Sequence, residues 1–348
     1  MVKSILVVVK TPTEPAPPVS VIESLSTGFE TVAARASLMV LPLLLDLFLW
    51  LGPHLSISPL THKFSTLLEE LVVNSTVTES RLTLTEVLQE AGENLNVFSF
   101  VSTAPLGIPS LMAAKAPMQT PSGQPPIWTI SGELQLITLF LGFTLIGLLL
   151  GSAYFAFIAH WIPRDEEQWD LQELFRRIWV YWARLVAFVL VISLLFAALS
   201  IPLLLLVGLA GLLSQTLANV VLSVAFAAGL WFFLYIGFAV HGIVLKDRAL
   251  MAAIWESVRL VQWNMSGVVG LFTLVFIISW GLGFVWNIPE ADTWLLLAGI
   301  VGHAFVTTGL IAATFVFYED RHRWWNELRE YRRQLIAQEQ ARRSKQST

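Results

Sequence analysis

The sequence predicts an all-α membrane protein, a bundle of about six transmembrane helices with amphipathic helices at the membrane surface. Hydrophobic residues make up 55% of its 348 residues and charged residues 13%, whereas soluble domains carry about 25% charged residues. A chain with so few charges cannot cover a surface that faces water. Lipid removes this difficulty, because side chains that face lipid need no polarity.

Six apolar stretches approach the ~20 residues that a helix needs to cross a 30 Å hydrocarbon core. We expect spans at about residues 37–51, 136–158, 185–207, 220–245, 267–286 and 295–317. The third is ambiguous, because its apolar run continues to Leu213. Pro202 within it predicts a kink or an early end of the helix. An amphipathic stretch at residues 21–32 precedes the first span.

The basic residues predict the orientation, because Lys and Arg are retained on the cytoplasmic side of a membrane. With six spans and the N-terminus inside, 18 of the 21 Lys and Arg residues fall on the inner side. We therefore expect a multi-pass protein of the cytoplasmic membrane with both termini in the cytoplasm. Residues 1–19, with four prolines between 11 and 18, are expected to form a disordered tail. Residues 20–318 then form the transmembrane domain, and residues 319–348 a basic amphipathic tail.

Residues 52–131 form the one long loop, on the extracytoplasmic side. Apolar residues recur at helical spacing over 60–72 and again over 84–95, which predicts two amphipathic helices on the outer membrane face or on the bundle. Residues 101–127 are rich in Pro, Gly and Ser and are expected to be irregular. The sequence leaves open whether this loop packs on the bundle.

Three further amphipathic segments are expected on the inner side. Two of them, at 169–183 and 249–263, precede the third and fifth spans. The third is the C-terminal tail, where an apolar stripe from Trp324 to Leu335 lies among five arginines. Such a helix is expected to bind anionic lipid headgroups at ~1 kcal/mol per basic residue. A solvated helical tail is the alternative.

The region from Phe233 to Ile277 resembles a bacterial family of six-helix integral membrane proteins. The family in turn resembles the membrane domain fused to some glycerophosphodiester phosphodiesterases. Its pattern is a span, a short charged turn, an elbow helix and another span, and the elbow positions that match are Ala253, Ser257, Leu260 and Val261. Residues 41–53 are similar to the first helix of related proteins from green non-sulfur bacteria. The resemblance implies a fold and a location but no reaction, and no segment is long or polar enough for the phosphodiesterase barrel.

Asp46 and His303 are the candidate functional pair. A carboxylate within a span costs ~2.5–3.5 kcal/mol, so it should face the bundle and have a partner. At 1.5 Å per residue, Asp46 lies about 10 Å and His303 about 12 Å from the outer ends of their helices. The functional interpretation is an ion or proton site. The alternative, which we favour, is a structural hydrogen bond between the two helices, or a bond from Asp46 to the backbone.

Small residues predict two faces at which helices pack closely. Gly147 and Gly151 stand in GxxxG spacing on the second span, and Ala298 and Gly302 stand likewise on the sixth. His160 and His241 lie at matching depth near inner helix ends. They could ligate a metal or haem, but anchoring at the interface is the favoured interpretation, so we expect no cofactor.

The sequence contains no Cys, no GxxxxGK[ST], no HExxH and no GxSxG, and thus no catalytic motif. Acidic residues accompany the inner arginines, so nucleic acid is not an expected partner. We expect a non-enzymatic envelope protein that acts as a scaffold or binds protein partners. The alternatives are a transporter or channel component that uses Asp46 and His303, and a redox or pigment-binding subunit that uses His160, His241 or His303.

Overall fold

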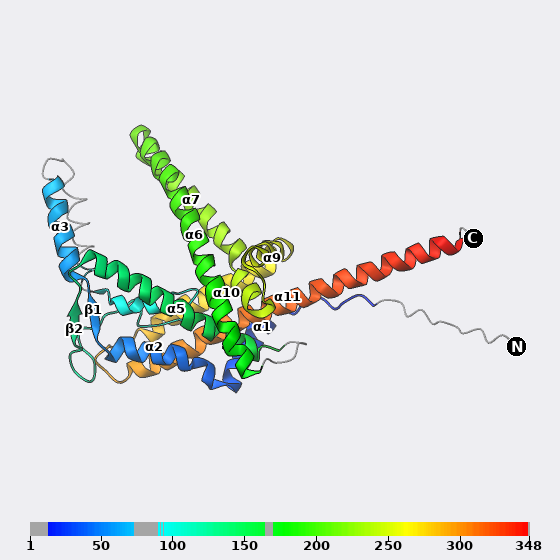
Figure 1. Ribbon diagram of the computed structural model, residues 1–348, viewed down its shortest axis with the longest axis horizontal. Coiled ribbons are helices and arrows are strands. Elements are labelled where there is room, and N and C mark those ends of the chain that lie inside the picture. Colours follow the sequence, from blue (N-terminus) through cyan, green and yellow to red (C-terminus); the bar gives the residue numbers. More distant parts are fainter. Residues whose placement is uncertain (1–12, 73–89, 91, 93, 164–169, 347–348) are drawn as a thin grey trace.

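The computed structural model describes residues 13–72, 90, 92, 94–163 and 170–346 of the chain. In this part nearly all regular structure is helical, and one pair of short strands is present, which confirms the all-α prediction (Figure 1). Five helical stretches are long and apolar enough to cross a membrane, and a bent pair of helices would make a sixth. By length and composition, these are the helices of a membrane-spanning protein.

The bent pair consists of α1 (Val21–Ala34) and the continuous helical stretch of η1 (Ala36–Met39) and α2 (Val40–Leu51), which meet at 93°. The second stretch agrees with the first span predicted at 37–51. Because the 12 residues of α2 extend only about 18 Å, a span of full length would need both members of the bent pair. The amphipathic face of α1 packs along α11 (Leu296–Gln346), where the Phe29 and Phe305 rings lie 5.7 Å apart. A Cβ at Gly28 would overlap the backbone of Ala313, so this glycine permits the close approach.

α5 (Glu133–Trp161) and α10 (Met265–Trp286) include the predicted second and fifth spans. α9 (Leu250–Trp263) agrees with the predicted helix at 249–263. The predicted fourth span at 220–245 lies within one candidate span, Gln215–Lys246, which has a short break at Gly237 and Phe238 between α7 (Gln215–Ile236) and α8 (Ala239–Lys246). This break lies beside α9 and is described below.

α6 runs without interruption from Leu171 to Leu213 and includes Pro202. The described part of 169–183 is therefore not the separate interfacial helix that was predicted. Of the two outcomes predicted for Pro202, a kink or an early end, the early end is excluded. The buried residues Leu174, Ile178 and Leu185 continue one face through the predicted boundary, and no helix-breaking residue separates the two parts. α6 and α7 form an antiparallel hairpin that projects from the body (Figure 1). Its large apolar side chains are exposed, as lipid-facing residues would be.

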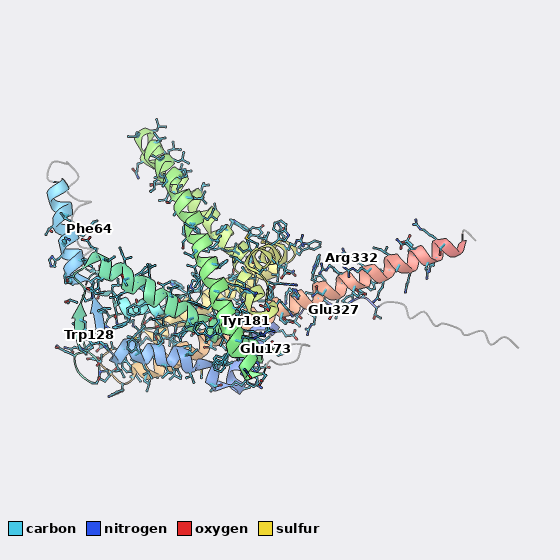
Figure 2. The ribbon with its side chains drawn as sticks, viewed as in Figure 1. Phe64, Trp128, Glu173, Tyr181, Glu327 and Arg332 are labelled. Atoms are coloured by element: carbon cyan, nitrogen blue, oxygen red, sulfur yellow. The ribbon has the colours of Figure 1, made fainter. Side chains whose placement is uncertain are left out.

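α11 also continues through a predicted boundary, since its 51 residues cross position 318 without a break. Its first part is packed in the core, whereas the part from Glu327 onward projects away from the body (Figure 2). At the transition, the backbone N–H of Val19 donates to the Asp320 carboxylate at 3.0 Å. Val19, the last residue of the predicted disordered tail, therefore contacts α11, whereas residues 1–12 of that tail lie outside the described residues.

The loop at 52–131 lies at the end of the molecule opposite the C-terminus (Figure 1). Its strands β1 (His54–Ser56) and β2 (Ile127–Thr129) pair in parallel, with Leu55 opposite Trp128. α3 (Ser58–Val72) confirms the first predicted amphipathic helix, whereas most of the second, at 84–95, lies outside the described residues. Between η2 (Val97–Val101) and β2 the chain has no helix or strand apart from an isolated bridge between Thr120 and Gly123, as the composition predicted.

Candidate functional site

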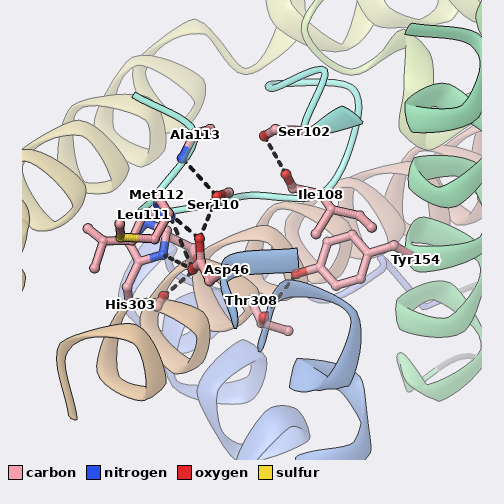
Figure 3. Close-up of polar contacts among 11 residues, drawn as sticks. Asp46, Ser102, Ile108, Ser110, Leu111, Met112, Ala113, Tyr154, His303 and Thr308 are labelled. Carbon is pink, nitrogen blue, oxygen red and sulfur yellow. Dashed lines mark hydrogen bonds and ion pairs between the residues drawn. The ribbon is translucent and has the colours of Figure 1, made fainter. Parts of the chain in front are cut away.

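Asp46 lies on α2 and its side chain is completely buried. Its carboxylate accepts three hydrogen bonds from one turn of the long loop (Figure 3). The hydroxyl of Ser110 donates to Oδ1 at 2.5 Å, the backbone N–H of Met112 donates to Oδ1 at 2.9 Å, and that of Leu111 donates to Oδ2 at 3.1 Å. The carboxylate therefore fastens the loop to the first bent helix pair.

The turn that Asp46 holds is part of the protein core. Ile108 and Met112 are buried within the main hydrophobic cluster of the helices. The turn is also bonded internally: Ser110 Oγ accepts the N–H of Ala113 at 3.0 Å, and the hydroxyl of Ser102 donates to the carbonyl of Ile108 at 2.7 Å (Figure 3). This part of the loop thus packs on the bundle, a point that the sequence left open.

His303 lies on α11 on the other side of the carboxylate. Its Nδ1 is 3.8 Å from Asp46 Oδ2, a separation too long for a hydrogen bond. Among the described residues, that buried nitrogen has no hydrogen-bond partner. The structure therefore brings the predicted pair together, but the bonds to Asp46 come from the loop rather than from His303.

A carboxylate offers about four lone-pair positions, and the loop donors occupy three of those on Asp46. This arrangement suits a structural anchor better than an ion site. Sequence reasoning missed Ser110, Leu111 and Met112, and no spacing signal could have found them, because two of the three donate through the backbone. The nearest signal was the irregular composition of 101–127, which is typical of a segment whose backbone needs side-chain partners.

A second buried polar contact joins α5 to α11. The Tyr154 hydroxyl donates to Thr308 Oγ1 at 2.9 Å, and both side chains are buried (Figure 3). Such a bond fixes the relative position of two helices whose other contacts are apolar. With Asp46, it connects α2, α5, α11 and the loop in one region of the protein.

Gly147 and Gly151 do allow a close backbone approach, but not of another α-helix. A Cβ at Gly147 would overlap the carbonyl oxygen of Val101, and one at Gly151 would overlap Leu106 and Gly107. The prediction of a helix–helix face was therefore wrong in its partner. The partner is the loop, which must pass close to α5 in order to reach Asp46.

The prediction of the second small-residue face agrees with the structure at Gly302 but not at Ala298. A Cβ at Gly302 would overlap the indole ring of Trp286 on α10. Ala298, however, is exposed, and Gly299 takes its place against the Trp286 carbonyl. The contact is thus made by Gly299 and Gly302, which face the backbone and the indole ring of Trp286, rather than by the predicted pair Ala298 and Gly302.

The elbow residues belong to α9 and lie beside the break between α7 and α8. Ser257 of α9 is fully buried; its hydroxyl donates to the carbonyl of Tyr235 at 2.6 Å and accepts the N–H of Phe238 at 3.1 Å. It thereby satisfies backbone groups that the interruption frees, as apolar surroundings require. Ala253 and Val261 are buried on the same face of α9, whereas Leu260 is half-buried.

Ser257→Ala is expected to lower the stability of the protein by about 1–3 kcal/mol, because both backbone groups lose their partner. Thermal unfolding of the purified protein in detergent measures this. Ser223→Ala is the matched control, since Ser223 is exposed on α7 and bonds to the Asn219 carbonyl of its own helix. Equal stability of the two variants would contradict this role for Ser257.

The remaining candidate histidines lie apart from the Asp46 turn. His241 Nε2 lies 2.8 Å from Thr314 Oγ1, and its ring lies 4.4 Å from that of Phe315. The ring of His160 lies 4.9 Å from that of Trp161. Within the described ranges, no group of three His, Cys, Asp or Glu side chains could hold a metal ion.

Burial affects two titratable groups of the loop outside the spans. Desolvation lowers the pKa of His54, at the start of β1, and also that of Lys115, three residues after Met112. Both shifts favour the neutral form. They are the expected consequence of a loop that is packed on the protein rather than extended into solvent.

Comparison with known proteins adds no assignment: no known family, no characterised protein and no solved structure matches this chain.

Proposed function

We propose that this chain is a non-enzymatic multi-pass protein of the cytoplasmic membrane that serves as a scaffold for partner proteins. The observation that carries the proposal is the Asp46 turn: the buried carboxylate is bonded three times to the loop. The buried carboxylate of Asp46 thus stabilises a folded surface instead of an ion pathway. The anchored loop, with its strands and α3, is the surface that a partner outside the cytoplasm would bind.

The proposed orientation has both termini in the cytoplasm and residues 52–131 outside. Its support is the 18-to-3 division of basic residues together with the separation of the loop and the C-terminal tail at opposite ends (Figure 1). Membership of the six-helix bacterial family is part of the proposal. The two hydrogen bonds of Ser257 support it, since they give the elbow pattern a structural reason.

The absence of cysteine makes the orientation directly testable. Met118→Cys in the loop and Ile336→Cys in the tail each introduce the one thiol of the chain, at a side chain that is exposed. In intact cells, a membrane-impermeant maleimide is expected to label Met118→Cys and to label Ile336→Cys only after the cells are lysed. Labelling of both thiols, or of the tail alone, before lysis would refute the orientation.

A transporter or channel component is the second candidate. The observation in its favour is the unpartnered Nδ1 of His303, 3.8 Å from a carboxylate oxygen. On protonation, this nitrogen could share a proton with Asp46, as relays in transporters do. The scaffold proposal remains the better supported, because the loop bonds leave Asp46 little capacity to exchange ligands.

Proton and ion flux in proteoliposomes distinguishes the two candidates. The scaffold proposal predicts no flux above that of empty vesicles from the native chain, from Asp46→Asn or from His303→Ala. A native flux that both variants abolish would instead establish a transporter with this pair as its site.

A further inference from the structure

A small cavity of about 100 Å³ lies between α9 and α11, at the point where α11 leaves the body. It lies near the middle of α11, farther along that helix than His303 and the Asp46 turn. The residues of its wall that matter here are Arg248, Glu256, Arg259, Arg321, Trp325 and Arg329. Four arginines around so small a space indicate a site for an anion.

The one carboxylate in the wall pairs with only one of these four arginines. Glu256 Oε1 lies 2.9 Å from Arg248 Nε, and Glu256 Oε2 accepts a hydrogen bond from the Tyr318 hydroxyl at 3.4 Å. Both of its oxygens are thus engaged. Arg259, Arg321 and Arg329 face no other acidic side chain among the described lining residues.

Arg321 gives an independent indication of a ligand. Its side chain is 6% exposed, and its guanidinium carbon lies 3.8 Å from the centre of the Phe317 ring. Nη1 donates to the adjacent Asp320 at 3.0 Å, but the buried Nε has no acceptor within the described chain. An unsatisfied buried donor on a charged group is costly, and an anionic oxygen in the cavity would satisfy it.

The aromatic part of the site resembles a membrane interface. Trp263 and Trp325 lie 4.4 Å apart in an edge-on pair, and the guanidinium of Arg329 lies 5.9 Å from Trp325. The apolar helix α10 begins two residues after Trp263. A headgroup in the cavity could therefore extend an acyl chain along an apolar helix, and Trp is enriched at this depth of a membrane.

The geometry points to a binding site for a phosphate group, supplied by an anionic phospholipid headgroup or by a free phosphate compound. Planar guanidinium groups bind phosphate oxygens through paired, charge-assisted hydrogen bonds. The lipid source rests on the proposed orientation, which puts this cavity at the inner membrane surface. The binding of a phosphate group does not depend on that orientation.

The test uses the full chain in phosphatidylcholine nanodiscs, with an environment-sensitive fluorophore on Glu327→Cys, which does not line the cavity. One arm increases the fraction of phosphatidylglycerol, and the other adds inorganic phosphate to phosphatidylcholine discs. Arg259→Gln combined with Arg329→Gln is expected to weaken binding about tenfold or more, a factor that corresponds to about 1.4 kcal/mol. Both residues are exposed, so the protein should still fold.

Arg332→Gln combined with Arg333→Gln is the matched control. It removes the same charge from exposed positions on α11 and should change binding only about twofold, because neither side chain lines the cavity. A response to the lipid alone identifies a headgroup site, and a response to phosphate as well identifies a site for the free ion. Equal losses in the two double variants, or no response in either arm, would overturn the proposal. A proton or ion flux in proteoliposomes would contradict the scaffold role, but it would leave the result of this phosphate-binding test unchanged.

Discussion

Asp46→Ala is expected to destabilise the protein by about 3 kcal/mol or more, because each buried donor left without an acceptor costs about 1–3 kcal/mol. The substitution removes the acceptor of the Leu111 and Met112 backbone N–H groups and of the Ser110 hydroxyl. Backbone donors cannot turn toward another partner without moving the chain. The loop should therefore detach, and trypsin should cleave after Lys115 much faster than in the native protein.

Two comparisons make this result specific to the anchor. Asp292→Ala removes a carboxylate from an exposed position in the neighbouring connection and should leave both the melting temperature and the cleavage rate unchanged. His303→Ala should cost less than Asp46→Ala, because Nδ1 makes no hydrogen bond in the described structure. If Asp46→Ala melted and was cleaved like Asp292→Ala, the carboxylate would not hold the loop.

Gly151→Ala is expected to destabilise the protein by about 1–3 kcal/mol through overpacking. A Cβ at this position would lie 2.6 Å from the Leu106 carbonyl oxygen and 2.6 Å from the Gly107 Cα. Neither contact can be relieved by a side-chain rotation, since both atoms belong to the backbone. The loop would have to move away from α5, which would also strain the bonds to Asp46.

Gly142→Ala, nine residues earlier on α5, is the control, and we expect it to raise the stability of the protein rather than lower it. Nothing lies within 4 Å of a Cβ there, and Ala is favoured over Gly in a helix by up to about 1 kcal/mol. Thermal unfolding in detergent should therefore separate the two Gly-to-Ala variants in opposite directions. A stable Gly151→Ala protein would mean that the loop does not approach α5 closely.

Much of the helical structure follows from the sequence alone. Apolar runs of sufficient length predicted α5, α10 and the apolar part of α11, because a span is a local property of composition and length. The amphipathic pattern likewise predicted α3 and α9, since the apolar residues on one face of a helix recur every three or four positions in the sequence. The sequence also marked Asp46 as a buried group and His303 as its neighbour, from depth alone.

Only the tertiary structure decided which segments of the chain those helices pack against. The 93° bend between α1 and the stretch that contains α2 depends on what each helix packs against. The sequence predicted that Gly147 and Gly151 form a helix–helix face. Small residues indicate that another segment packs closely there, but they do not identify that segment. Asp46 is bonded to backbone N–H groups, which every non-proline residue carries. The sequence by itself therefore determined that a carboxylate is buried in this protein, and the fold alone decided that the long loop satisfies it.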